Sequence, residues 1–137
     1  MAELVTIPQD VREFVKGKMA WVGTASKDGT PNATPKGSVQ ILDDSHLIFA
    51  DLFSRKTRAN LKENPQVSVT VIDLATFKGY QFKGTAELTD SGPLFEKVKE
   101  QLKQAPGQLP PPVYVVRIAV HAIYDQSAGP DAGKQIL

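Results

Sequence analysis

QVSVTVIDLATFKGYQFKGTAELT, residues 66–89, decides the fold. Val67, Val69 and Val71 alternate with small polar residues, which is the pattern of a strand with one buried face. After a short turn, residues 78–89 alternate again, with aromatic and aliphatic side chains on one face and Gln, Lys, Thr and Glu on the other. Two such strands joined by a short turn predict an antiparallel pair.

The rest of the chain adds four strands and three helices to this pair. The predicted strands are 18–26, 31–42, 46–52 and 112–126, and the predicted helices are 8–17, 54–64 and 91–104. Asp28-Gly29, between the first two strands, is the strongest hairpin signal in the chain. Because a twisted sheet of six strands removes its exposed edges by closing, the expected fold class is mainly β: an antiparallel barrel of six strands with short peripheral helices.

Composition limits the classes of protein to which the chain can belong. Its 137 residues predict one domain, 1–137, with a real hydrophobic core. The absence of cysteine excludes disulfides and thiolate metal sites. The net charge of +1 argues against a general nucleic-acid binder, and no segment approaches the roughly 20 apolar residues of a membrane span. The N-terminus has acidic residues early and no apolar signal region, so we expect a cytoplasmic protein.

An unusual charge pattern marks the start of the predicted helix 54–64. Ser54 is a favourable N-cap, yet Arg55, Lys56 and Arg58 follow it in the first turn. A helix N-terminus already carries roughly +0.5 of an elementary charge, so these cations are unfavourable there. A bound phosphate would remove the conflict, because free N–H groups, hydroxyls and cations all favour an anion. The alternative is a solvated helix face whose cations pair with Asp51, with Glu63 or with nothing.

Two other segments carry weaker signals. Pro35, Lys36 and Gly37 fall inside a predicted strand, where they indicate either backbone exposed to a ligand or an ordinary edge bulge. Gln81 lies on the polar face of its strand, where it either faces solvent or hydrogen-bonds a planar heterocycle. The two histidines lack the spacing of a metal site, and no nucleotide-binding or catalytic sequence motif occurs. We therefore assign no metal ligand and no catalytic residue.

The chain resembles the FMN-binding split-barrel family, the relatives of pyridoxamine 5′-phosphate oxidase. The resembling segments are 22–42, 46–71, 79–88 and 116–136. The most specific feature is a strand followed by Ser-Arg-Lys-Thr, then Asn-Leu, then Asn-Pro. The resemblance implies a split antiparallel barrel that forms a homodimer, with FMN bound at the subunit interface. It also implies that the Gly-rich tail folds over the cofactor or the partner subunit.

The resemblance implies a set of FMN-binding residues. Those at the phosphate are Ser54, Arg55, Lys56 and Thr57, with Asn60 supporting the loop. Those along or beside the isoalloxazine ring are Pro35, Lys36, Gly37, Ser38, Ala50, Asp51 and Gln81. Lys36 is expected near the N1–C2 side of the ring, where it would stabilise negative charge on reduced flavin.

The function implied by this resemblance is that of an FMN-dependent oxidoreductase of undetermined substrate. The chain lacks the oxidase's C-terminal segment with Arg and His, so we do not expect it to oxidise pyridoxamine phosphate. Two alternatives stay open: an FMN-binding electron carrier or flavin store, and a ligand-free barrel that acts as an interaction module. Some relatives bind a deazaflavin or haem instead. The phosphate site suits FMN or a deazaflavin and would contribute little to haem binding.

Overall fold

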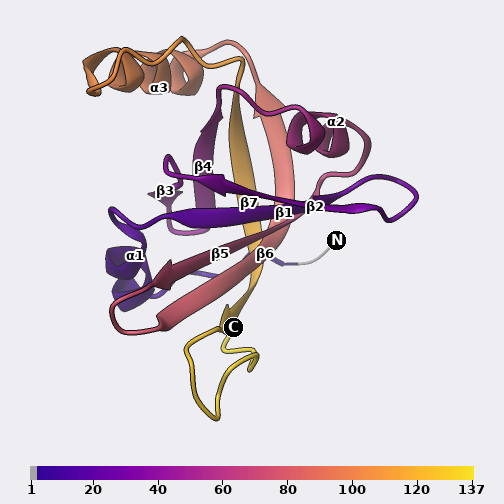
Figure 1. The fold of residues 1–137 in the computed structure, drawn as a ribbon, viewed down its shortest axis with the longest axis vertical. Coiled ribbons are helices and arrows are strands. Elements are labelled where there is room, and N and C mark those ends of the chain that lie inside the picture. Colours follow the sequence, from indigo (N-terminus) through magenta and orange to yellow (C-terminus); the bar gives the residue numbers. More distant parts are fainter. Residues whose placement is uncertain (1–2) are drawn as a thin grey trace.

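The computed structural model describes residues 3–137, which form one seven-stranded sheet and three helices (Figure 1). Residues 1–2 of the expected domain lie outside the described part. The strands are β1 (Ala20–Ala25), β2 (Pro31–Lys36), β3 (Gln40–Asp43), β4 (His46–Asp51), β5 (Gln66–Asp73), β6 (Lys78–Thr89) and β7 (Tyr114–Asp125). The helices are α1 (Gln9–Val15), α2 (Lys56–Glu63) and α3 (Pro93–Gln104).

The strands pair in the order β2-β1-β5-β6-β7-β4-β3, and each neighbouring pair is antiparallel. The alternating valines of β5 face inward, where Val69, Phe82 and Ile118 are completely buried in the main hydrophobic cluster. This cluster also takes up Val11 and Val15 from α1. The expected mainly β, antiparallel fold with peripheral helices is therefore confirmed.

The prediction of one strand over residues 31–42 is wrong, and this accounts for the seventh strand. The chain forms β2 and β3 instead, which lie at opposite edges of the sheet order. Pro35 lies in β2, which is the first strand of the sheet order and pairs with β1. An edge strand tolerates proline because it has no second neighbouring strand that would need the missing N–H. Residues 37–39 connect the two strands, and this short link brings the sheet edges within about 14 Å of each other. The sheet must therefore curl, as a split barrel does.

The other two helices lie outside the barrel. α3 packs on the outer face of β4 and β7 through a second apolar cluster. The members of this cluster are Ile48, Ala50, Phe95, Val98 and Val115. α2 lies against β1 and β2 and buries only Thr57 and Leu61 (Figure 1). Within residues 3–137, no helix is both long enough and apolar enough to cross a membrane.

The C-terminal tail, residues 126–137, folds back on β7 of its own chain. Tyr124 pairs with Gln135, and the backbone N–H of Ile136 donates to the carbonyl of Ile123 at 2.8 Å. Figure 1 shows this segment at the end of the molecule opposite α3. The tail therefore lies against the sheet of its own chain. That it also covers the cofactor or the partner subunit, as the resemblance implies, stays a prediction.

Candidate functional site

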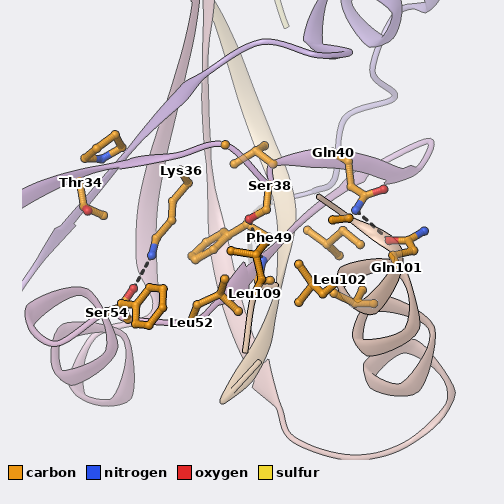
Figure 2. Close-up of a pocket in the computed structure, with 18 of the residues that line it drawn as sticks. Thr34, Lys36, Ser38, Gln40, Phe49, Leu52, Ser54, Gln101, Leu102 and Leu109 are labelled. Atoms are coloured by element: carbon orange, nitrogen blue, oxygen red, sulfur yellow. Dashed lines mark hydrogen bonds between the residues drawn. The ribbon is translucent and has the colours of Figure 1, made fainter. Parts of the chain in front are cut away.

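A cavity of about 790 Å³ opens where β2, the link 37–39, β4 and α3 meet. Figure 2 shows Lys36 and Ser54 at one end, Gln40 and Gln101 at the other, and Phe49 between them. Small-molecule sites typically measure roughly 300–1,000 Å³, so the cavity has the size of a cofactor or substrate site.

Lys36 and Ser54 form the cation end of the cavity. The ammonium of Lys36 donates a hydrogen bond to the hydroxyl of Ser54 and lies 5.7 Å from the centre of the Phe49 ring. Burial lowers the pKa of Lys36, and the opposing effect of the Asp51 carboxylate is too small to cancel it; the charge of Arg58 lowers it further. An anion in addition to Asp51 would therefore be favourable beside the Lys36 ammonium.

Asp51 neutralises one of the three cations that follow Ser54. Its carboxylate is 2% exposed and accepts hydrogen bonds from Arg58 Nε at 2.6 Å and Nη2 at 3.3 Å. It also accepts the backbone N–H of Ser54 at 3.1 Å. Burial opposes the ionisation of Asp51, but these hydrogen bonds outweigh it, so its pKa is lowered. Asp51 therefore braces the loop before α2 through Arg58 and Ser54.

Arg55 and Lys56 remain available at the start of α2. Both are exposed, and over residues 3–137 neither has an acidic partner within ion-pair distance. Ser54 was expected to cap this helix, but the N-cap is Arg55 and its side chain makes no capping bond. The two cations therefore face solvent beside Ser54 and the cation end.

Polar contacts hold α2 on the barrel. Asn60 donates to the hydroxyl of Thr24 at 3.1 Å, and Asn32 donates to the hydroxyl of Thr57 at 3.2 Å. Thr57, expected at the phosphate, is 3% exposed and its side chain faces β2. Asn60, expected to support the loop, ties α2 to β1. These contacts fix the helix start relative to the cavity.

The predicted site residues divide into three groups in space. Those that line the cavity are Pro35, Lys36, Gly37, Ser38, Ala50 and Ser54. Those in or beside the start of α2 are Asp51, Arg55, Lys56, Thr57 and Asn60. Gln81 belongs to neither group. It lies on the outer face of β6, where its side-chain amide donates to Thr70 at 3.3 Å.

Sequence reasoning missed the side of the cavity formed by α3. Val98, Gln101 and Leu102 line it, together with Leu109 from the following loop. The apolar stripe of α3 predicts a buried face, but the same stripe suits a cavity wall and a core. Phe49 was missed for the same reason. Only the arrangement of the strands shows that β4 ends at a cavity.

Sequence comparison places the chain in a family. Residues 7–127 match the sequence profile of the pyridoxamine 5′-phosphate oxidase family. The protein MJ0282 of Methanocaldococcus jannaschii is 34% identical over 135 residues, which cover 97% of this chain and 89% of that protein.

Structure comparison agrees with the sequence match. The crystal structure of HupZ from Group A Streptococcus has a TM-score of 0.81 and 30% identity, and the match covers 93% of this chain and 99% of that one. An FMN-binding protein from Syntrophomonas wolfei has a TM-score of 0.75 over 87% of this chain and 85% of that one, and its 17% identity shows the shared fold alone. The profile match spans most of the chain, and two relatives are at least 30% identical to it. The chain therefore belongs to the pyridoxamine 5′-phosphate oxidase family.

Proposed function

We propose that this protein binds FMN and is a flavin-dependent oxidoreductase. The observation that carries the proposal is the grouping of Lys36, Arg55 and Lys56 around the start of α2, at the end of a cavity of cofactor size. A phosphate monoester carries nearly two negative charges at neutral pH and has oxygens that accept several hydrogen bonds. The phosphate would therefore supply the negative charge needed to balance these three cations.

The residues present fit FMN in both of its parts. The phosphate would be held by Arg55, Lys56 and Ser54, with Lys36 beside them. The ring would lie along residues 35–38, where the backbone lines the cavity and Ser38 accepts the N–H of Ala50 at 3.1 Å. When bound, the flavin would supply the redox chemistry, while the protein orients it and excludes water.

We propose a homodimer that forms through the outer face of β1, β5, β6 and β7. Trp21, Thr70, Gln81 and Tyr124 are cross-strand neighbours there, and Trp21 is 38% exposed. The face adjoins the cavity, because Pro35 lines the cavity and pairs with Trp21. Since Gln81 does not line the cavity of its own chain, a contact with flavin would require a second copy. A Trp21→Glu variant that stays dimeric in analytical ultracentrifugation would refute this surface.

The test of FMN binding is a titration followed by flavin fluorescence, with the double variant Arg55→Ala/Lys56→Ala. Hydrogen bonds to charged groups contribute about 1.5–3 kcal/mol each, so we expect the variant to bind FMN about 100-fold more weakly or worse. Riboflavin, which lacks the phosphate, should bind the wild type and the variant equally. A Lys97→Ala/Lys103→Ala control removes two exposed lysines from α3 and should leave FMN binding unchanged.

Two results would contradict the proposal: a wild-type protein that ignores FMN, or a variant that loses FMN and riboflavin to the same extent. The first would leave the cations without a flavin ligand. The second would indicate general damage to the protein rather than the loss of a phosphate site.

A second candidate function is that of an FMN-binding electron carrier or flavin store. Among the described residues that line the cavity, Lys36 alone is ionisable, so one chain offers no acid–base pair for substrate turnover. Steady oxidation of a reduced nicotinamide by the FMN-loaded protein would favour the oxidoreductase. Electron exchange with a redox partner, without such turnover, would favour the carrier.

A further inference from the structure

The α3 side of the cavity differs chemically from the cation end. Its walls, here called the apolar end, are aliphatic: Ile48, Val98, Leu102 and Ala105. Among the lining residues within 3–137, none at this end carries a charge. A charged ligand would lose its hydration there without gaining a counter-charge, so the apolar end favours a neutral ligand.

A pair of amides closes the apolar end. The side-chain N–H of Gln40 donates to the side-chain oxygen of Gln101 at 3.4 Å, and both residues are exposed at the rim (Figure 2). A bond of this length is weak, and each amide keeps further donors or acceptors. The pair can therefore hydrogen-bond a carbonyl or hydroxyl on the edge of a ligand whose body lies between the aliphatic walls.

We propose that the apolar end is a subsite for a neutral ring compound with a carbonyl edge, of the size and polarity of a naphthoquinone. The position of the subsite next to a flavin rests on the proposed function, whereas the binding of the ring compound does not. The apolar end continues directly into the part of the cavity lined by Phe49 and residues 35–38. A compound bound there would lie beside whatever occupies the cation end.

The test compares 1,4-naphthoquinone with 1,4-naphthoquinone-2-sulfonate by isothermal titration calorimetry. The chain has no cysteine, so no thiol can react with the quinone. We expect saturable binding of the neutral compound, and binding of the sulfonate about 10-fold weaker. Ala105→Phe fills the apolar end and should weaken naphthoquinone binding about 10-fold, while Ala128→Phe, the same change at an exposed position in the tail, should have no effect.

A second variant guards against misfolding of the first. Leu102→Lys adds a cation at the end of α3, where its stem can lie along the apolar wall and its ammonium can reach water. We expect this variant to reverse the preference, so that the sulfonate binds more tightly than the neutral compound. Unchanged selectivity in Leu102→Lys would overturn the proposal.

The remaining outcomes separate this proposal from that of FMN binding. Naphthoquinone binding that is absent, equally strong in Ala105→Phe, or abolished by saturating FMN would overturn the separate subsite, even if FMN binds. Naphthoquinone binding that Ala105→Phe weakens would support the subsite, even if FMN does not bind. FMN affinity in Ala105→Phe should stay within about twofold of the wild type.

Discussion

The two helices beside the cavity are attached to the barrel in different ways. α2 packs Leu61 into the main hydrophobic cluster and is otherwise held by hydrogen bonds to β1 and β2 and by the Arg58–Asp51 ion pair. α3 buries Phe95 and Val98 in an apolar cluster with β4 and β7. The side-chain hydrogen bond that joins α3 to a strand, from Gln40 to Gln101, is long and exposed.

This difference corresponds to the ligand that we propose for each end of the cavity. Hydrogen bonds have preferred lengths and directions, so they fix the start of α2, where we propose that the cations contact a phosphate. Apolar contact has no preferred direction, so α3 can shift slightly and still bury the same surface. We infer that α2 holds its first turn in a fixed position, whereas α3 can shift slightly to accommodate different ligands.

The largest effect is expected from Asp51→Asn, which leaves Arg58 without its counter-charge. Breaking a fully buried pair costs about 3–5 kcal/mol, and because Arg58 is partly exposed we expect about 2–3 kcal/mol of lost stability. Urea unfolding measures this change. FMN affinity should fall as well, because the loop before α2 loses its brace.

Asp131→Asn is the matched control for this prediction. Asp131 pairs with Lys134 at 3.2 Å in the exposed tail, and exposed pairs contribute little to stability. If both variants unfold at the same urea concentration, the Asp51–Arg58 pair does not hold α2, and the contrast between the helices fails.

Val98→Ala tests the apolar attachment of α3. It removes about two buried methylene equivalents, so we expect about 1.5 kcal/mol of lost stability. FMN affinity should stay within about twofold, because Val98 lies away from the cation end, whereas naphthoquinone should bind more weakly. A loss of FMN affinity as large as in Asp51→Asn would show that α3 also positions the phosphate.

Asn60→Ala removes one of the polar ties of α2. It leaves the hydroxyl of Thr24, which is buried, without its partner, so we expect about 1 kcal/mol of lost stability. Asn64→Ala, just after the helix, removes an exposed contact with the N–H of Gln66 and should cost less in the same urea experiment. Equal losses of stability in the two variants would mean that the buried hydrogen bond from Asn60 stabilises the protein no more than the exposed one at Asn64.

Features with a local sequence pattern could be predicted, and features that depend on tertiary contacts could not. The alternating strands and the cations after Ser54 were visible because their patterns are local. The division of residues 31–42 was not, because β2 pairs back with β1 while β3 pairs forward with β4, and the alternation of residues does not show that these two hairpins lie at opposite ends of the sheet order. Asp51 was one of two acidic residues named as possible partners of the cations, and it contacts Arg58 and Ser54. Its place beside the ring stays a prediction. Which carboxylate meets which cation depends on tertiary structure, which the sequence pattern does not contain.

The smallest effect concerns pH and separates the two ends of the cavity. Because burial lowers the pKa of Lys36 below the ordinary value of 10.5, this lysine loses its proton at a lower pH than an exposed one. A phosphate favours the protonated form, so FMN affinity should fall as pH rises through the pKa of Lys36. The affinity for naphthoquinone, which binds at the apolar end, should not follow this change.

Lys36→Met should remove this part of the pH dependence, and Lys103→Met, on the exposed side of α3, should keep it. The titration of the flavin itself is common to all three proteins, so it cancels in the difference between their affinity profiles. If Lys36→Met and the wild type show parallel profiles, Lys36 does not reach the phosphate. The cation end would then consist of Arg55, Lys56 and the start of α2 alone, and Lys36 would keep its position near the ring as a separate proposal.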